Sequence, residues 1–344
     1  MSTHIDELDP IEPREALELF MDKRRSNNRA PSTLTSNRSH LRIFIQWLEG
    51  QGLTNLNELT GRDVFQYRQK REHEDGLAPA SLKGQISTIR MFLQFCEEIE
   101  ALPQDFHRKV DPVKLNVGEE ISDVAIDIEE AEAILDHLQR FEYASQRHVT
   151  FALLWHTDMR TGALHSLDID DIRWDDRALR LRHRPDTGTT LKNKERSERM
   201  VAVGSDTLQI VEDWLAHNRP DTTDEYGREP LIASQQGRAH KSTIRQVIYN
   251  VTRPCYYQNE CPHGREPTEE GCEAIPYHSA GKCPTSVAPH AIRKGSLTRD
   301  LANDLPIETL SERADVTPRV LRQHYDTRTE KTKMEQRRDV LGLD

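Results

Sequence analysis

A stripe of apolar side chains at helical spacing most restricts how the first part of this chain can fold. Leu82, Ile86, Ile89, Leu93 and Cys96 follow the break at Pro79 at alternating intervals of four and three residues. This spacing places them on one face of a helix and predicts that the face is buried. Cys96 is therefore expected to be a small buried apolar residue without a redox role.

Two further helices are predicted in the same region. One begins near Ser32 or Thr33, which can cap it, and ends at the glycines 50 and 52; the other covers about 60–73. The first carries an apolar stripe of Leu34, Leu41, Phe44, Ile45 and Leu48. Residues 1–30 are polar and partly helical by pattern. We therefore expect a small all-α domain over residues 1–108, followed by a linker over 109–123, where Pro112 and Gly118 interrupt an aperiodic segment.

The pattern changes in the second part of the chain. Helical stripes over 127–141 and 145–156 are followed by short strand-like runs at 169–173, 178–184 and 199–203. A polar, basic loop at 185–198 separates the last two runs. Helices are expected again from residue 206, at 288–302, 306–314 and 317–323, and in the charged tail from 331. The fold class is thus mainly α with a small antiparallel β-sheet, in a domain over 124–335 with a C-terminal tail at 336–344.

The charge balance bears on the choice of partner. The formal net charge is −11, whereas proteins that bind nucleic acid usually carry a basic excess. One interpretation is an enzyme that does not act on DNA; the other is a carboxylate-rich surface adapted to concentrated salt. Basic residues still gather in local runs, at 23–25, 180–184 and 192–199. The sequence has no apolar run of membrane-spanning length and no signal sequence at the N-terminus, so we expect an intracellular protein, in the cytoplasm or associated with the nucleoid, with no membrane partner.

A set of separated polar residues carries the chemistry. Transfer at a phosphodiester requires a nucleophile, cations for the transition state and an acid for the leaving oxygen. Arginines suit the cation role because a guanidinium grips two phosphate oxygens, and a phenol forms a reversible phosphoester. A lysine suits the acid role because its proton affinity is easily moved by desolvation. Candidates in chain order are Arg160, Lys192, His290, Arg293 and Tyr325.

In this order and with these gaps, the set resembles the tyrosine recombinases, the family of phage-type integrases that includes Xer-like and archaeal members. The segment from Thr157 resembles the family's first box, in which Arg160, Leu164, Leu167 and Asp171 fit. Two positions depart from the pattern, because Asp158 replaces a usual glycine and Ala163 replaces a usual glutamate that supports the site. The resemblance covers nearly the whole chain.

The remaining boxes extend the resemblance. The family's lysine lies in a β-hairpin turn, which Lys192 fits best, with Lys194 as the alternative. The His290-Ala-Ile-Arg293 box opens a helix, and thirty-two positions separate Arg293 from Tyr325, as the family requires. One element departs: where the family has histidine or tryptophan, this chain has Arg313, which could donate to phosphate in its place. His324, beside the tyrosine, is another candidate substitute.

The resemblance implies a two-domain architecture, with a helical core-binding domain and an α+β catalytic domain that clamp double-stranded DNA. It implies a site-specific recombinase that cleaves and rejoins DNA through a 3′-phosphotyrosyl intermediate in a homo-tetramer, with no catalytic cofactor. Two alternatives stay open. One is relaxation of DNA by chemistry like that of type IB topoisomerases. The other is a DNA-binding protein with a weakened site, which the departures at Ala163 and Arg313 would explain.

A cysteine-rich insert at 255–283 precedes the second arginine box. Four of the five cysteines lie here: Cys255, Cys261, Cys272 and Cys283. Four thiolates suit a tetrahedral Zn²⁺ ion, and in an intracellular protein such a cluster indicates metal binding before disulfides. The expectation is therefore a structural zinc site that braces the neighbouring box. The alternative is a loop of reduced cysteines that pack against the core.

Overall fold

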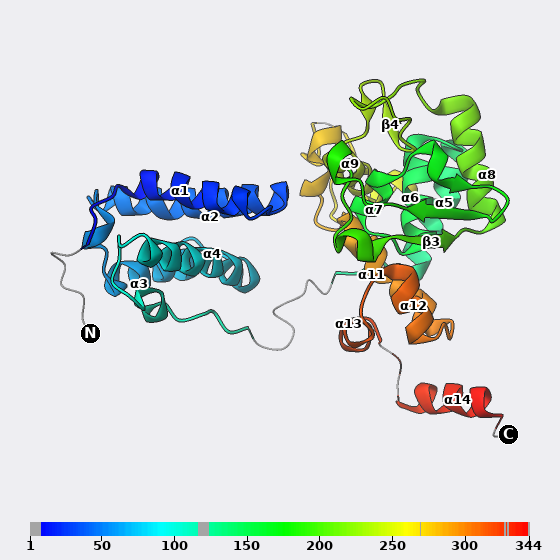
Figure 1. The fold of residues 1–344 in the computed structure, drawn as a ribbon. Coiled ribbons are helices and arrows are strands. Elements are labelled where there is room, and N and C mark those ends of the chain that lie inside the picture. The colour runs from blue at the N-terminus through cyan, green and yellow to red at the C-terminus, as the bar shows by residue number, and fades with distance from the viewer. Residues whose placement is uncertain (1–7, 116–123, 269, 327, 329, 343–344) are drawn as a thin grey trace. The chain divides into compact units, whose positions relative to one another are not determined.

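The computed structural model describes residues 8–115, 124–268, 270–326, 328 and 330–342. The chain forms two compact units, Met1–Asp123 and Val124–Asp344, each of which is described by itself (Figure 1). The predicted linker lies outside the described residues at 116–123, and the predicted tail does so at 343–344. No helix among the described residues is long and apolar enough to cross a membrane.

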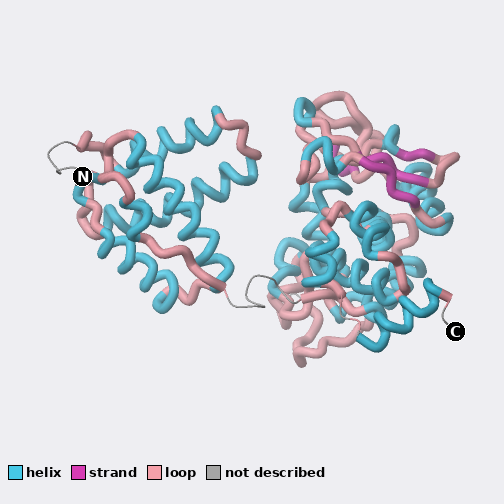
Figure 2. Tube along the Cα trace, turned by 60° about the horizontal axis from the view of Figure 1, so that its bottom comes forward, coloured by secondary structure: helices cyan, strands magenta, loops and turns pink. Residues whose placement is uncertain are grey.

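The N-terminal unit consists of helices joined by loops (Figure 2). The helices are α1 (Pro13–Ser26), α2 (Pro31–Gly50), α3 (Gly61–Gln69), which a π-helical turn (Lys70–Glu74) continues, and α4 (Pro79–Glu98). Short 3₁₀ turns cover Leu56–Glu58 and Phe106–Lys109. Proline opens α1, α2 and α4, a position where its missing N–H costs nothing. Helix α2 therefore begins at Pro31 after Ala30, and the predicted caps Ser32 and Thr33 lie inside its first turn.

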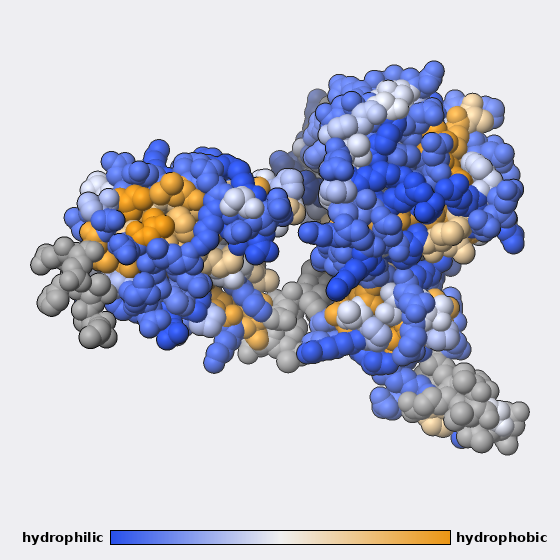
Figure 3. Space-filling model, in the orientation of Figure 1, coloured by the Kyte–Doolittle hydropathy of each residue, from blue (hydrophilic) through white to orange (hydrophobic). Residues whose placement is uncertain are grey.

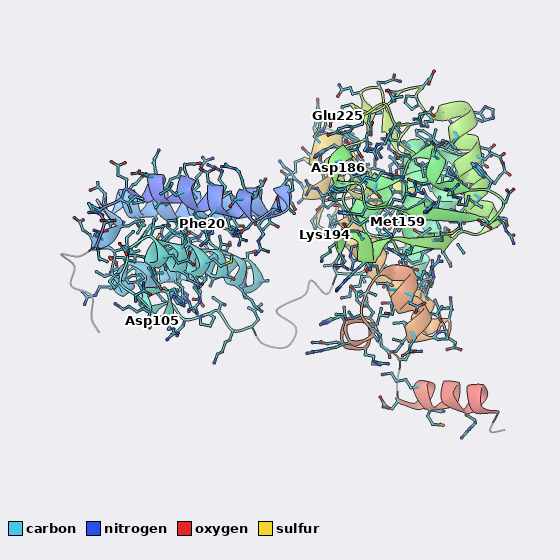
Figure 4. All side chains as sticks on the ribbon, in the orientation of Figure 1. Phe20, Asp105, Met159, Asp186, Lys194 and Glu225 are labelled. Carbon is cyan, nitrogen blue, oxygen red and sulfur yellow. The ribbon has the colours of Figure 1, made fainter. Side chains whose placement is uncertain are left out.

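Aromatic side chains fill the core of this unit. Phe20 of α1, labelled in Figure 4, contacts Phe92 of α4 edge to face at 5.7 Å between ring centroids, and Phe44 contacts Tyr67 at 4.9 Å. Every residue of the predicted α4 stripe is buried, and Cys96 is fully so, which confirms its apolar role. Helix α1 also contributes a buried face, which its polar composition did not predict: Ala16, Leu17, Phe20 and Met21.

The C-terminal unit contains most of the helices. They are α5 (Ile128–Phe141), α6 (Gln146–Thr157), α7 (Thr161–Ser166), α8 (Ser205–Asp213) with a π-helical turn (Trp214–Asn218), α9 (Lys241–Val251), α10 (Pro254–Tyr257), α11 (Pro289–Ala302), α12 (Ile307–Ala314), α13 (Pro318–His324) and α14 (Glu330–Leu341). Helix α6 is buried on nearly every side, as a central helix must be. Its apolar residues from Val149 to Trp155 are at most 2% exposed.

A three-stranded antiparallel sheet, β1-β2-β3, joins these helices: β1 (Ile172–Arg173), β2 (Ala178–Leu181) and β3 (Arg199–Ala202). Leu179 of β2 pairs with Ile172 on one side and Val201 on the other. The small antiparallel sheet is thus confirmed, although β1 is shorter than predicted. Residues 169–171 instead form a 3₁₀ turn, because Asp168 and Asp171 cap each other's backbone N–H groups.

A second hairpin, β4 (Ala233–Ser234) and β5 (Gly237–Arg238), was not predicted from the sequence. Gly237 has a φ of 102°, and a Cβ there would lie 2.7 Å from the Thr223 carbonyl oxygen, so only glycine fits. Strands of two residues carry too little alternation to be recognised in a sequence.

The visible face of both units is mostly hydrophilic (Figure 3).

A small separate core holds the last helices of this unit together. Leu297 and Leu301 of α11 pack with residues of α12 and α13, and Tyr325 belongs to the same cluster: Leu297, Leu301, Leu310, Ala314, Leu321 and Tyr325. Helix α12 also contacts strand β3 of the three-stranded sheet. The segment from 303 to 326 is thereby placed beside both α11 and the β2–β3 loop.

Candidate active site

One cavity of about 680 Å³ in the C-terminal unit collects residues from the separate sequence boxes. The turn between α6 and α7, the β2–β3 loop, the start of α11 and the segment from α12 to the end of α13 all contribute. Its polar lining contains more basic than acidic side chains and includes a phenol. The lining residues are Arg160, Lys192, Asn193, Arg196, Glu198, Arg199, His290, Arg293, Ser311, Glu312, Asp315, Val316, Thr317, Pro318, Val320 and Tyr325.

Arg160 lies at the N-cap of α7, in the turn that follows α6. Its Nη1 donates to the Asp315 carboxylate at 2.5 Å and its Nη2 to the Asp315 carbonyl oxygen at 2.6 Å. The side chain remains 27% exposed, at the cavity wall. A guanidinium has five N–H groups, so further donors are available to a ligand.

Arg293 is almost fully buried on α11, with 2% exposure. Its Nη1 donates to the Asp158 carbonyl oxygen at 2.5 Å and its Nη2 to the Ala314 carbonyl oxygen at 2.7 Å. Burial and, after it, the charge of Arg160 lower the pKa of Arg293 to about 10, whereas a negative Tyr325 opposes the shift. The side chain is thus a fixed cation whose direction is set by main-chain carbonyl groups.

His290 lies in the first turn of α11, one residue after Pro289. The residue is exposed to solvent and its side chain lines the cavity. Desolvation lowers the pKa of the His290 ring, and the cations Arg293 and Lys192 lower it further. The ring is therefore neutral at neutral pH and able to accept a proton.

Lys192 follows buried Leu191 in the β2–β3 loop and lines the cavity. Lys194, the alternative, has a φ of 58° and lies at the edge of the unit (Figure 4). Of these two lysines, only Lys192 is among the described residues that line the cavity. Lys192 and His290 both line this cavity, and the charge of Lys192 contributes to the lowered pKa of His290.

Tyr325 directly follows α13 and caps it, as its N–H donates to the Leu321 carbonyl oxygen at 3.0 Å. The side chain is 7% exposed, and it lines the cavity while packing in the small core of α11, α12 and α13. The helix begins where the Thr317 hydroxyl caps the N–H of Val320 and Pro318 takes the first turn. Neighbouring His324 is not among the described lining residues.

Arg313, the predicted substitute for histidine or tryptophan, does not line the cavity as the structure describes it. Its Nε donates to the Asp158 carboxylate at 3.1 Å, and its terminal nitrogens donate to the carbonyl oxygens of Ala202 and His156. Asp158, which replaces a usual glycine of the first box, is fully buried with a φ of 55°, a left-handed conformation that aspartate tolerates. Its carboxylate pairs with the half-buried guanidinium of Arg313, so two positions that depart from the family pattern form one ion pair.

The structure adds site residues that the sequence did not identify. Arg199 of β3 lines the cavity and donates to the carbonyl oxygens of Arg313 and Ser197. Burial lowers its pKa to about 10. Asn193 and Asp315 also line the cavity. The density of basic residues at 192–199 was the available signal for Arg199, whereas nothing local distinguished Asp315.

The cysteine-rich insert is mostly irregular chain between α10 and α11. Cys272 and Cys283 are buried and pack with Ala274, and all four cysteines are free thiols. Burial raises the pKa of Cys255, and the other three thiols add to the shift. No three His, Cys, Asp or Glu side chains of the described residues are arranged to hold a metal ion. The predicted structural zinc site is therefore not supported by the structure.

Known proteins share this fold. The chain is 23% identical over 313 residues to a probable integrase/recombinase protein of Methanocaldococcus jannaschii. The aligned region covers 90% of this chain and 84% of that protein. It is 25% identical to the tyrosine recombinase XerC of Actinobacillus succinogenes, over 58% of this chain and 63% of XerC. The Tn1549 transposon integrase in complex with a circular intermediate DNA superposes with a TM-score of 0.67 at 14% identity, over 94% of this chain and 99% of that chain.

A lambda integrase dimer bound to a COC′ core site superposes with a TM-score of 0.62 at 12% identity, over 94% of this chain and 79% of that chain. Two family profiles match the chain. The N-terminal SAM-like domain of phage integrases matches residues 17–98, and the phage integrase family matches residues 125–315. The match covers more than half of the sequence and includes the turn of Arg160, the sheet and the second arginine box. The chain therefore belongs to the phage integrase family, the tyrosine site-specific recombinases.

Proposed function

We propose that this protein cleaves and rejoins double-stranded DNA through a 3′-phosphotyrosyl intermediate. The observation that carries the proposal is the single cavity in which a phenol, Tyr325, shares a wall with Arg160, Arg293, Lys192 and His290. A cavity lined by a nucleophile, fixed cations and proton-transfer groups suits transfer at a phosphodiester. These residues come from four separate segments of the sequence, and their meeting in one cavity supports a shared chemical role.

In the proposed first step, the Tyr325 oxygen attacks the scissile phosphorus. Neutral His290 takes the phenolic proton, and the bond from phosphorus to the 5′-oxygen breaks. Lys192 gives a proton to that 5′-oxygen, which leaves as a hydroxyl. The 3′-phosphate is then bound to tyrosine, so the bond energy is retained and the step reverses when another 5′-hydroxyl attacks. No metal or nucleotide cofactor is required for this balance.

Arg160 and Arg293 hold the non-bridging phosphate oxygens in this proposal. Each already donates to protein oxygens, so each cation is oriented before the substrate arrives. Preorganised donors need no rearrangement as charge develops, which is why they contribute more than mobile ones. Arg313 takes a supporting role, because its donors point to internal acceptors.

The proposed substrate is duplex DNA with two recognition sites, exchanged in a homo-tetramer. Residues 1–108 would bind DNA as the core-binding domain, and 124–335 would carry the reaction. The similar Tn1549 and lambda integrases are seen with DNA, and the lambda protein is seen as a dimer. Their fold supports a DNA partner here. We place the reaction inside the cell, where its substrate is.

Covalent capture tests the proposal. The full chain is incubated with a library of nicked duplexes whose flanking sequences are randomised, and adducts that survive denaturant are collected and sequenced. We expect DNA joined through Tyr325, and no adduct from Tyr325→Phe, which binds DNA equally well. An adduct with the Tyr325→Phe protein would overturn the assignment of the nucleophile.

The selected sites then separate recombination from relaxation. A recombinase exchanges strands between two duplexes that carry the selected site and does not act on supercoiled DNA without it. Relaxation of supercoiled plasmids that lack the site would favour the activity of a type IB topoisomerase. Binding without any adduct from the natural sequence would favour a DNA-binding protein with an inactive site.

A further inference from the structure

Asp315 is the point at which three parts of the candidate site meet. Its carboxylate accepts from Arg160 Nη1 at 2.5 Å, from Ser197 Oγ at 2.6 Å and from Asn193 Nδ2 at 3.0 Å. Arg160 belongs to the α6–α7 turn, and the other two donors lie in the β2–β3 loop, which also carries Lys192. Asp315 itself lies on the segment that continues to Tyr325. These contacts span 118 to 155 positions of sequence.

The backbone explains how one residue reaches all three donors. Asp315 is the C-cap of α12, with a φ of 54° in the left-handed region. This conformation presents its carbonyl oxygen and its carboxylate to the same guanidinium, since Arg160 Nη2 donates to the carbonyl oxygen at 2.6 Å. Aspartate adopts such a conformation more readily than most residues, because its short side chain bonds locally.

The electrostatics keep the group negative. Burial alone would raise the pKa of Asp315, but the hydrogen bonds from Ser197 and Asn193 and the charge of Arg160 hold it below its usual value. The side chain is only 16% exposed. A desolvated carboxylate in a cavity that must bind an anionic phosphate repels the substrate, so its presence requires a compensating role.

We propose that Asp315 is a positioning residue that holds Arg160 and the loop of Lys192 in one fixed geometry. Arg160 can then contact a non-bridging phosphate oxygen while Lys192 reaches the leaving 5′-oxygen. The inference rests on the proposed function and deepens it. Asp315 touches neither phosphate nor leaving group; it acts through the residues that do. Arg160 stays partly exposed and lines the cavity while its ion pair with Asp315 holds the guanidinium in place.

Single-turnover cleavage of a captured nicked site tests this role. Asp315→Ala is expected to lower the cleavage rate at least about tenfold, the cost of 1.4 kcal/mol of transition-state stabilisation, with DNA affinity changed less than about threefold. Asp315→Asn keeps an acceptor for Arg160 and should recover part of the rate. Asp176→Ala removes an exposed carboxylate in the β1–β2 turn of the same unit and should leave both quantities unchanged.

A substrate with sulfur at the bridging 5′-position isolates the loop contribution. A thiolate leaves without a proton, so this substrate does not need the acid on the Lys192 loop. The paired change Asn193→Ala and Ser197→Ala removes the loop donors to Asp315, together with the Ser197 hydroxyl that accepts from the Asn193 N–H, and keeps the ion pair of Asp315 with Arg160. We expect it to be slow on the oxygen substrate and at least tenfold less impaired on the sulfur substrate, a rescue that a purely structural defect would not show.

The outcomes separate this inference from the proposed function. If the natural sequence forms no adduct, the proposed function fails. If the natural sequence forms adducts and Asp315→Ala cleaves at the same rate, the positioning role is wrong. Faster cleavage by Asp315→Ala would show that Asp315 instead blocks Arg160. Equal loss of cleavage and of DNA binding, without sulfur rescue of the loop variants, would likewise overturn the inference.

Discussion

The two units of this protein bury different kinds of side chain. The N-terminal unit buries aromatic rings that meet edge to face, and among its described residues the buried Glu97 carboxylate accepts from the main-chain N–H of His107. The C-terminal unit buries ionic groups that come from distant parts of the chain, among them Asp158 and Arg293. Buried charges cost free energy unless they are paired, so their concentration in one unit marks where function was built into the fold.

The comparison separates stability from preorganisation. Apolar burial stabilises the N-terminal unit without requiring a particular direction for any one side chain. In the C-terminal unit, carbonyl oxygens and carboxylates fix the orientation of the arginine side chains around the cavity. Burying these charges costs desolvation free energy, but it orients the cations before a substrate binds. Substitutions in the first unit should therefore change mainly its stability, and substitutions around the cavity should change mainly the reaction.

The largest effect is expected in the aromatic core. Phe92→Ala removes a fully buried ring that contacts Phe20 and should lower the free energy of unfolding of the N-terminal unit by about 3–5 kcal/mol. Phe65→Ala is the matched control, because that ring is 61% exposed, and it should cost little. Urea unfolding of the full chain, followed by separate probes in each unit, measures both. A parallel shift of the C-terminal transition would break the comparison.

The buried ion pair gives the next largest effect. Arg313→Ala leaves the Asp158 carboxylate buried without its cation and should destabilise the C-terminal unit by about 3 kcal/mol. Replacing both partners, with Asp158→Asn and Arg313→Gln, should recover part of this cost because no uncompensated charge remains. Thermal and urea unfolding of Asp158→Asn, Arg313→Gln and the double variant complete the cycle. A single-variant cost below about 0.5 kcal/mol, typical of exposed pairs, would contradict the assignment.

The arginines of the cavity should act on the rate. Arg293→Ala and Arg160→Ala are each expected to slow cleavage at least about a hundredfold, the scale of losing one transition-state donor, while DNA binding weakens far less. Arg322→Ala removes a cation from the exposed face of α13 and serves as the control. Single-turnover cleavage and binding are measured side by side. Parallel losses of binding and cleavage would reduce these arginines to contacts that only locate the DNA.

A buried carboxyl near the site predicts a pH dependence confined to the C-terminal unit. Burial and the neighbouring Asp158 charge raise the pKa of Asp300 to about 6. Between the ordinary pKa of an aspartate and about pH 6, the native state therefore keeps a proton on Asp300 that the unfolded state has released. This protonation stabilises the fold fully below the ordinary pKa, and the stabilisation is lost as the pH rises through about 6. The free energy of unfolding should fall by roughly 1.4 kcal/mol per pH unit in that window.

Asp300→Asn should flatten this dependence, because an amide donates to Asp158 at any pH. Unfolding followed from pH 4 to 8 is the measurement, with Asp176→Asn, an exposed carboxyl, as the control. An unchanged slope in Asp300→Asn would show that another group titrates.

Local patterns predicted most of the fold, and long-range contacts decided the rest. The α4 stripe and the helices around the cavity were predicted because apolar periodicity is a property of neighbouring residues. The two-residue strands β4 and β5 were missed because they show no period. Arg313 was predicted at the phosphate because its position in the sequence fits, but its partner Asp158 lies 155 positions away and turns it inward.

The same limit explains Asp315 and the cysteines. Asp315 looks like an ordinary helix-ending residue, and only the fold shows that Arg160 and Asn193 converge on it. The cysteine spacing indicates a metal, yet ligand geometry depends on how the irregular insert is folded. Composition and spacing thus predict which chemistry is available, while the three-dimensional contacts determine which side chain carries it.

The smallest and most diffuse effect concerns the net charge of −11, which belongs to the whole chain. An acidic protein and a polyanion repel each other at long range, and salt screens that repulsion within about 10 Å at 0.1 M and about 3 Å at 1 M. The local basic runs still release counterions from DNA, which weakens binding as salt rises. Because the two effects oppose each other, we expect DNA affinity to fall with salt unusually gently, and the melting temperature to rise toward molar salt. Binding and melting curves over the same salt series test this, and a steep loss of affinity with no gain in melting temperature would show that the acidity is no adaptation to salt.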